Sequence, residues 1–585
     1  MTSFRSTLIA IWRLAIPYFR SEDRGPALAL LGSVVALELT AVGITVLINQ
    51  WRARFYNALQ EFNWDAFVRE IIIFAILAGV FILVRVYQLY LNQWLQIRWR
   101  RFLTTRYLGG WLGDGNHYRM QLLGDAADNP DQRIAEDIRQ FIDGGSNGVG
   151  VLPVGLGLLN SVVTIGSFLL ILWGLSDAAQ LTLFGWQIPG FLVWAALIYA
   201  IVGTTLTHFI GRVLTRLNYD QQHYEADFRF HLVRTRENSE QIALMHGEPA
   251  ERGRHMERFA AVMANWLQIM KRTKYLSFFT TTYGQLSIIF PYVVLAPAYF
   301  AKRIQLGGLM QTADAFSNVQ DSLSYFITAY RAFAEWRAVI ERLSGFEAAI
   351  ESASNIAEQR PTIATVTHEA AQIQLAHLEV DLPEGRPVVA ADGIAFGPRD
   401  RVLVTGPSGS GKSTLFRAIA GIWPLGKGRV VLPARATTMT LPQRPYLPIG
   451  LLTAAVSYPS APGSFAPKRI RELLVAVGLP RLATQLADEA HWNRTLSLGE
   501  QQRIAIARAI LHAPDFLLLD EATASLDEPA EAALYALLRE RLPGTTIISI
   551  GHRSTLNAFH TRHLALKPDG DHFRLREADL AAVTS

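Results

Sequence analysis

The fold of this chain is decided by residues 496–503, LSLGEQQR, which lie between a phosphate-binding loop and an acidic strand end. A serine and a glycine at the start of a helix direct a hydroxyl, backbone N–H groups and the positive helix end toward an anion. Ser497 and Gly499 occupy these two positions. We therefore predict that this helix end contacts a phosphate group.

The phosphate-binding loop lies upstream of that helix. Residues 401–405, RVLVT, are typical of a strand, and the loop GPSGSGKST at 406–414 precedes a helical run, LFRAIAGI. The glycines allow backbone N–H groups to close on phosphate oxygens, while Lys412 neutralises β/γ-phosphate charge and Ser413 can bind Mg²⁺. The predicted nucleotide contacts are Gly406, Pro407, Ser408, Gly409, Ser410, Gly411, Lys412, Ser413 and Thr414.

Further polar residues follow the loop in a fixed order. Gln443, in LPQRPYL, is suited to touch a metal ion and an attacking water. The buried strand FLLLDE directs Asp520 toward Mg²⁺ and Glu521 toward water as a general base. His552 is suited to hold the γ-phosphate, and Asp527, in ATASLD, to lie at a dimer seam. Each residue alone has a plainer structural interpretation, but the ordered set predicts a catalytic group (Glu521, His552, Gln443) and metal ligands (Ser413, Gln443, Asp520).

The composition indicates a membrane protein. Charged residues make up only 18% of the 585 residues and the mean hydropathy is +0.18, which is too apolar for an ordinary cytosolic enzyme. The net charge of +5 comes mostly from basic residues among apolar stretches, which favours membrane topology over a nucleic-acid partner. Because cysteine is absent, disulfides, thiolate nucleophiles and zinc-thiolate sites are excluded.

Six segments are apolar enough to cross a bilayer, which takes about 20 helical residues. They are 27–48, 68–91, 151–174, 188–211, 276–300 and 306–330. Lys and Arg number seven in 92–149 and eleven in 211–275, against two in 49–67 and none in 175–187. The positive-inside rule then places both termini in the cytoplasm. We expect the chain to be an integral plasma-membrane protein, of a bacterial inner membrane, in contact with membrane lipid. The two basic loops are long enough to continue the helices into the cytoplasm.

The chain divides into three predicted parts. Residues 1–345 form a transmembrane domain, and its first stretch, TSFRSTLIAIWRLAIPYF, is interpreted as an amphipathic elbow helix at the membrane surface. The long apolar runs stop in a linker at 346–372. Residues 373–585 form a soluble nucleotide-binding domain, where strand-like segments begin.

The sixth apolar segment carries a polar stripe at steps of three and four residues, which is one face of a helix. Its members are Gln311, Asp314, Asn318, Asp321, Tyr325 and Thr328. The functional interpretation is the wall of a wet translocation cavity, because two carboxylates are hard to satisfy in a dry contact. The alternatives are polar packing against another helix, or a helix that extends outside the lipid. Glu38 and Arg85, in the first two segments, either join the cavity or pair with each other.

The motifs of the C-terminal part resemble those of the ABC transporter ATPase domain over about residues 373–585. The resemblance implies that GPSGSGKS is the Walker A loop, LSLGEQQR the signature and FLLLDE Walker B, with Gln443 in the Q-loop, Asp527 in the D-loop and His552 as the switch histidine. It also implies ATP and Mg²⁺, and that the signature contacts the γ-phosphate of ATP held by a partner subunit. Two departures stand out. Leu498 replaces a usual glycine, and no aromatic residue between 373 and 392 is present to stack on adenine, so base recognition is weak or uses Arg386 or an apolar contact.

The membrane half is similar to SbmA/BacA-type peptide permeases and to the related peroxisomal acyl-CoA half transporters over most of residues 45–345. The similarity rests on INQWRARFYNALQ, IRWRRFL, DNPDQRIAEDIRQF, YEADFRFHLV, ENSEQIALMHGE and IQLGGLMQTADAFSNV. It implies an α-helical six-span transmembrane domain of ABC exporter type, followed by an α/β P-loop ABC nucleotide-binding domain, in a homodimer.

A half-transporter supplies half of two composite ATP sites, so a two-fold homodimer is the economical assembly. We expect segments 129–141 and 237–247 to carry ATP-driven motion to the membrane helices, although solvated helix is the plainer interpretation of both. The leading function is ATP-driven import of bulky hydrophilic compounds such as peptides or cobalamin. The alternatives are an exporter or lipid and acyl-chain transporter, a membrane sensor that hydrolyses ATP poorly, and an ATPase acting on nucleic acid, against which the six spans argue.

Overall fold

The computed structural model describes residues 4–124, 129–145, 148–179, 182–183, 186–356 and 361–578. The chain forms two compact units. Unit 1 comprises Met1–Tyr107 and Pro130–Gly345, and unit 2 comprises Leu108–Asn129 and Phe346–Ser585. Each unit therefore draws on two separate stretches of sequence.

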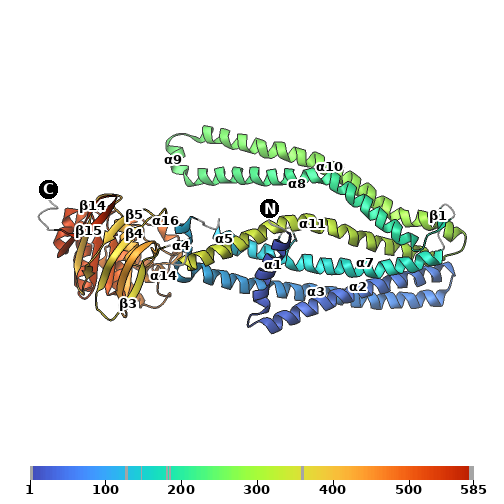
Figure 1. The fold of residues 1–585 in the computed structure, drawn as a ribbon, viewed down its shortest axis with the longest axis horizontal. Coiled ribbons are helices and arrows are strands. Elements are labelled where there is room, and N and C mark those ends of the chain that lie inside the picture. Colours follow the sequence, from blue (N-terminus) through green and yellow to red (C-terminus); the bar gives the residue numbers. More distant parts are fainter. Residues whose placement is uncertain are drawn as a thin grey trace. The chain divides into compact units, whose positions relative to one another are not determined.

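Unit 1 is built almost entirely from helices (Figure 1). They are α1 (Phe4–Phe19), α2 (Arg24–Gln60), α3 (Trp64–Leu112), α5 (Pro130–Gln132), the π-helical turn η2 (Arg133–Asp137), α6 (Ile138–Asp143), α7 (Val151–Ala179), α8 (Phe191–Glu237), α9 (Ser239–Leu244), α10 (Glu248–Phe300) and α11 (Leu306–Ser354). The last turns of α3 and α11 belong to unit 2. A short hairpin, β1 (Thr182–Leu183) and β2 (Trp186–Gln187), precedes α8.

Five helices among the described residues are long and apolar enough to cross a membrane, and they cover the first five predicted spans except residues 188–190 of the fourth. These are α2, α3, α7, α8 and α10. Large apolar side chains on them are exposed in the isolated chain, such as Leu170 at 77% and Ile201 at 63%, which suits contact with lipid. The chain is therefore an integral membrane protein.

The sixth predicted span, 306–330, lies within the 49-residue helix α11, which is not one of those five. Side chains of residues 326–335, including Thr328 of the stripe, lie outside the described residues. Membrane crossing by α11 therefore stays a prediction. The helices α3, α8 and α10 continue well beyond the predicted spans, as expected from the charged loops.

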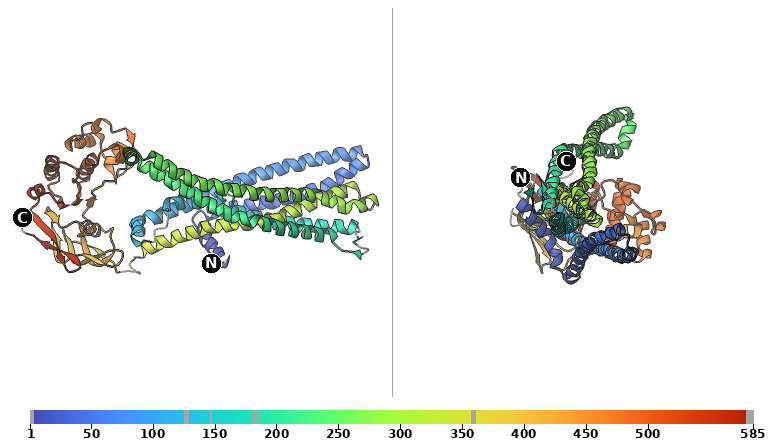
Figure 2. Two further views of the ribbon diagram at one scale, coloured as in Figure 1. Left: turned by 90° about the horizontal axis from the view of Figure 1, so that it is seen from above. Right: turned by 90° about the vertical axis from the view of Figure 1, so that its right-hand side faces the viewer.

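Helices α8 and α10 run side by side and are joined at one end by α9 (Figure 2). Tyr199 of α8 stacks on Tyr283 of α10 with ring centroids 4.4 Å apart. Each hydroxyl donates a hydrogen bond to the backbone carbonyl of the other tyrosine at 2.7 Å. A Cβ at Gly203 would lie 2.1 Å from the Tyr283 ring, so this close approach requires glycine. The reciprocal contact fixes the two helices as a pair.

Unit 2 is an α/β domain around a large mixed sheet. Its strands are β3 (Ala364–His368), β4 (Ile373–Asp381), β5 (Pro387–Ala391), β6 (Ile394–Phe396), β7 (Arg401–Thr405), β8 (Gly426–Pro433), β9 (Thr438–Leu441), β12 (Phe516–Asp520), β13 (Thr546–Ile550), β14 (Arg562–Asp569) and β15 (His572–Glu577). The order across the sheet is β3-β8-β4-β5-β15-β14-β7-β13-β12-β9, with β6 paired to β4. The last five strands of this order, β14, β7, β13, β12 and β9, are mutually parallel. Their apolar residues are buried between covering layers, as expected for parallel strands.

Helices surround this sheet. They are α4 (Asn116–Leu123), α13 (Lys412–Ile419), α14 (Leu452–Ser457), α15 (Pro467–Ala476), α16 (Trp492–Thr495), α17 (Leu498–His512) and α18 (Glu528–Arg541), with 3₁₀ turns η1 (Gly113–Gly115), η4 (Leu482–Thr484) and η5 (Ser554–Phe559). A further two-stranded sheet pairs β10 (Gly450–Leu451) with β11 (Glu489–Ala490). The predicted order of a helical part followed by a P-loop α/β domain is confirmed.

Two stretches outside the predicted nucleotide-binding domain also belong to unit 2. Tyr118 and Leu122 of α4 pack against its apolar core, and Asn116 donates a hydrogen bond to Ser354 at the end of α11. The stretch predicted as a linker, 346–372, contains the last turns of α11 and the strand β3. Phe346 is fully buried.

Candidate nucleotide site

A cavity of about 410 Å³ opens in unit 2 at the carboxyl ends of the parallel strands β7, β12 and β13. This edge of an α/β sheet is where ligands usually bind. The described lining consists of Leu382, Arg386, Pro387, Val388, Ser408, Gly409, Ser410, Gly411, Lys412, Ser413, Thr414, Gln443, Asp520, Glu521, His552, Asp571 and Phe573. Most residues predicted from the loop and the strand ends therefore converge here, and Gly406 and Pro407 adjoin them at the start of the loop.

The loop between β7 and α13 has the geometry of a phosphate cradle. Gly409 and Gly411 have φ of +79° and +85°, a left-handed conformation that favours glycine. A Cβ at Gly411 would lie 2.5 Å from the side chains of both Val388 and Val389. Lys412 Nζ donates to the carbonyls of Gly406 at 2.9 Å and Pro407 at 2.8 Å. Burial lowers the pKa of Lys412, and the carboxylates Glu521 and Asp520 oppose that shift.

The residues predicted to hold Mg²⁺ come together at this loop. Ser413 Oγ donates to Asp520 Oδ1 at 2.9 Å, and Gln443 lines the same cavity. Burial raises the pKa of Asp520, while the Ser413 hydrogen bond acts in the opposite direction. A hydroxyl, a carboxylate and an amide supply the oxygen ligands that Mg²⁺ prefers, with phosphate oxygens completing the coordination. The donor set therefore fits Mg²⁺ bound together with a nucleotide.

Glu521 lies between two other predicted catalytic side chains. Gln443 Nε2 donates to one of its carboxylate oxygens at 3.1 Å, and His552 Nε2 lies 3.3 Å from the other. Glu521 has φ of +50°, which is rare for a residue with a side chain and costs about 1–3 kcal/mol. Its backbone N–H donates to the carbonyl of Ile550 at 3.2 Å, so the end of β13 holds this turn in place.

The signature residues form a second group, which does not line the described cavity. Ser497 is the N-cap of α17 in a capping box with Glu500: its Oγ accepts from the Glu500 N–H, and Glu500 accepts from the Ser497 N–H. Gly499 fits against the next loop, since a Cβ there would lie 3.2 Å from Leu526. Asp527 caps α18 by accepting from the Ala530 N–H at 3.2 Å. Ser497 and Asp527 are exposed.

Two residues that sequence reasoning missed hold the loop before Asp527. Gln502 is fully buried: its amide N–H donates to the Gln443 carbonyl, and its amide oxygen accepts from the Ser525 N–H, both at 3.0 Å. From the other side, Arg553 donates to the carbonyls of Leu526 at 2.6 Å and Ala524 at 3.2 Å. Gln502 lies inside the motif LSLGEQQR and Arg553 follows His552. Neither position in the sequence indicates that the side chain contacts the loop before Asp527.

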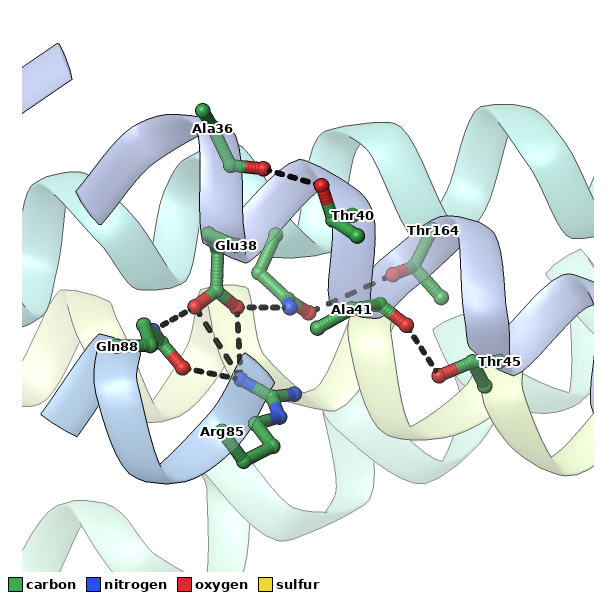
Figure 3. A network of polar contacts seen from close by, with 9 residues as sticks. Ala36, Glu38, Thr40, Ala41, Thr45, Arg85, Gln88 and Thr164 are labelled. Carbon is green, nitrogen blue, oxygen red and sulfur yellow. Dashed lines mark hydrogen bonds and ion pairs between the residues drawn. The ribbon is translucent and has the colours of Figure 1, made fainter. Parts of the chain in front are cut away.

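Glu38 in the membrane half is paired rather than free (Figure 3). It is buried on α2 and accepts hydrogen bonds from Arg85 at 3.2 Å and from Gln88, both on α3. Asn160 of α7 donates to it as well. Of the two alternatives, the pairing of Glu38 with Arg85 is the one observed.

The polar stripe of α11 also has partners on α2. Asp314 forms an ion pair with Arg52 and accepts from Asn49 at 2.7 Å, while Asn318 donates back to the Asp314 carbonyl at 2.9 Å. Asn49 also donates to the carbonyl of Gln311. This part of the stripe therefore packs polar face to polar face. Asp321, by contrast, is exposed in the isolated chain.

Comparisons with known proteins agree with this architecture. The family model described as ABC transporter transmembrane region 2 matches residues 11–300, and the model described as ABC transporter matches residues 394–524. The inner membrane ABC transporter ATP-binding protein YddA of Escherichia coli (strain K12) is 34% identical over 92% of this chain and 93% of that protein. The lysosomal cobalamin transporter ABCD4 of Mus musculus is 28% identical over 81% of each chain.

Among solved structures, a bacterial Atm1-family ABC exporter with ATP bound superimposes with a TM-score of 0.67 over 93% of this chain and 95% of that chain. The sequence identity is 17%, so the likeness concerns the fold. The predicted exporter-type arrangement of a helical membrane region followed by a nucleotide-binding domain is confirmed.

Proposed function

Since this chain belongs to the ABC transporter family and is an ATP-driven half-transporter, we propose that two identical copies move bulky hydrophilic compounds, such as peptides or cobalamin, inward across a bacterial inner membrane. The main support for a dimer is that the predicted nucleotide-binding residues form two separate groups. The phosphate loop, Asp520, Glu521 and His552 share one cavity, whereas Ser497, Gly499 and Asp527 lie outside its described lining. A second copy would bring the missing group to each cavity.

The residues in the cavity support hydrolysis of ATP. The loop N–H groups and Lys412 would bind the phosphates, and Ser413, Asp520 and Gln443 would hold Mg²⁺, which neutralises phosphate charge when bound. Glu521 would take the proton of the attacking water as general base. Its contacts with Gln443 and His552 keep the carboxylate oriented for that transfer.

Two segments of unit 1 are proposed to pass the motion on. Segment 129–141 contains α5, η2 and part of α6, and segment 237–247 contains α9. Leu244 and Met245 are 74% and 73% exposed at the tip of the α8–α10 pair. Exposed apolar side chains on a charged hairpin favour a protein partner over solvent. In the proposed dimer, these tips would lie against a nucleotide-binding domain.

The proposed substrate class is based on the polar groups of the membrane helices and on the similarity of this chain to two kinds of transporter. The polar contacts centred on Glu38 join α2 to α3, two helices apolar enough to cross the membrane, and those of Asp314 join α2 to α11, whose crossing we propose. Polar groups within membrane helices usually mark functional positions. One relative is a cobalamin transporter, and the quoted membrane motifs are similar to those of peptide permeases. An exporter of lipids or acyl chains is the competing proposal, for which a more apolar interior is expected.

Uptake of labelled cobalamin and of a labelled peptide into a strain without endogenous uptake tests the substrate and the direction together. The matched control is the Glu521→Gln variant, which would be inserted but not hydrolyse ATP. Accumulation that requires the chain and is lost in the control supports import. If the labelled compound accumulates in inside-out vesicles and not in whole cells, the protein exports it, and the proposal of import is wrong.

A further inference from the structure

The nucleotide cavity has a second wall, which the phosphate loop does not supply. It is formed by the turn between β4 and β5 and the turn between β14 and β15. Leu382 and Arg386 line it from the first turn and Pro387 and Val388 from the start of β5, while Asp571 lines it from the second turn and Phe573 from the start of β15. Because the loop and the metal ligands account for the triphosphate, this wall is the part of the cavity left for the base and the ribose.

The strand order brings Phe573 to this wall. Strand β15 pairs with β5 in parallel, with Phe573 opposite Val389, and with β14 in an antiparallel hairpin, with Phe573 opposite Pro568. Val388 and Val389 in turn lie against Gly411 of the phosphate loop. Phe573 therefore lies on a strand that is paired along both edges, and the neighbouring strand β5 packs against the phosphate loop.

The side chain of Phe573 has the chemistry that a purine requires. It carries the only benzene ring in the described lining of the cavity, and Leu382, Pro387 and Val388 add apolar surface. The Phe573 side chain is partly buried and packs against the apolar core of unit 2, which restricts its movement. A fixed aromatic ring binds a base by stacking with little loss of side-chain entropy.

We propose that Phe573 stacks on the adenine of ATP and is the base-binding residue of this chain. The proposal rests on the proposed nucleotide site and deepens it. The proposal explains how the chain can stack on adenine although residues 373–392 contain no aromatic side chain, because the ring comes from β15, far along the sequence. The exposed Arg386 and Asp571 lie on the same wall beside the stacked base.

Binding of two probes to the purified full-length protein tests this assignment. The probes are AMP-PNP, which has a base, and inorganic tripolyphosphate, which has none, each measured with Mg²⁺ by calorimetry. Phe573→Leu keeps apolar volume and loses the ring, so AMP-PNP affinity should fall about 5- to 150-fold, the range for one stacked base, while tripolyphosphate affinity stays at the wild-type value. Phe573→Trp should retain AMP-PNP affinity.

Arg576→Ala is the matched control, since it changes the same strand at an exposed residue outside the cavity lining, and it should bind both probes like wild type. Wild-type AMP-PNP affinity in Phe573→Leu would overturn the stacking contact, and so would an equal loss for both probes. A wild-type protein that binds neither probe would instead overturn the nucleotide site itself.

Discussion

Replacing Gln502 with leucine removes the link between the loop of Gln443 and the loop before Asp527 without touching the phosphate loop. Leucine keeps similar volume in a fully buried position but cannot donate to the Gln443 carbonyl or accept from the Ser525 N–H. Gln443 contacts Glu521, so one of the two side chains beside the proposed general base loses a fixed support. We expect ATP turnover to fall while nucleotide affinity is kept.

The size of the effect follows from the partners. Gln443 and Ser525 are exposed, so water can replace the two lost hydrogen bonds, and each loss costs the net value of about 0.5–1.5 kcal/mol rather than a full desolvation penalty. A total of about 2 kcal/mol lowers the Tm of a domain of this size by about 4–8 °C. Turnover should fall further, by about 100-fold, because a small misplacement of reacting groups is costly.

The assay combines turnover, Tm and AMP-PNP affinity on the same preparation. The control is Thr545→Val, which loses a buried hydrogen bond of 2.7 Å to the Pro514 carbonyl at the opposite, amino ends of the strands. It should lower the Tm and leave turnover unchanged. If Gln502→Leu hydrolyses ATP as fast as this control does, the link has no role in positioning the site.

Other outcomes are expected for residues of the nucleotide cavity, for Leu498 of the signature and for the buried His560. Glu521→Gln should bind AMP-PNP like wild type and lose about 10²- to 10⁴-fold in turnover, since a general base contributes that factor; unchanged turnover in the purified protein would remove Glu521 as the base. Leu498→Gly should hydrolyse ATP at an equal or higher rate if leucine is a tolerated variant, and a sharp loss would give leucine a specific role. Burial lowers the pKa of His560 to about 4 from an ordinary 6.5, so its contribution to stability is present above about pH 6.5 and is lost as pH falls toward 4. The loss at pH 5 is about 2 kcal/mol, and His560→Gln should show a smaller fall in Tm between pH 7.5 and pH 5. Equal acid sensitivity in both proteins would contradict that cause.

Local patterns were enough to predict the strand ends and the loop. The strand predicted at 401–405 is β7, and the acidic pair at 520–521 closes a buried strand as expected. Both follow from short apolar runs next to glycine or charge, which depend only on neighbours in sequence. The roles of the site residues follow from the family resemblance and remain predictions.

Contacts between distant segments could not be predicted in this way. Phe573 reaches the cavity only because β15 lies beside β5, and Asp314 is paired because Arg52 extends from α2, beyond the span predicted there. The grouping of Tyr118 with the nucleotide-binding unit likewise depends on packing against strands hundreds of residues away. One sequence contains no signal for such pairings.

The central claim is that two copies share each ATP site, and mixing two inactive variants tests it most directly. Lys412→Ala disables the phosphate loop, and Ser497→Arg disables the signature at an exposed position. Dimers formed from one copy of each would contain one intact site, made by the loop of the second variant and the signature of the first. We predict that co-expression yields ATPase activity above that of either variant alone. Activity no higher than that of the two separate variants would contradict a shared site.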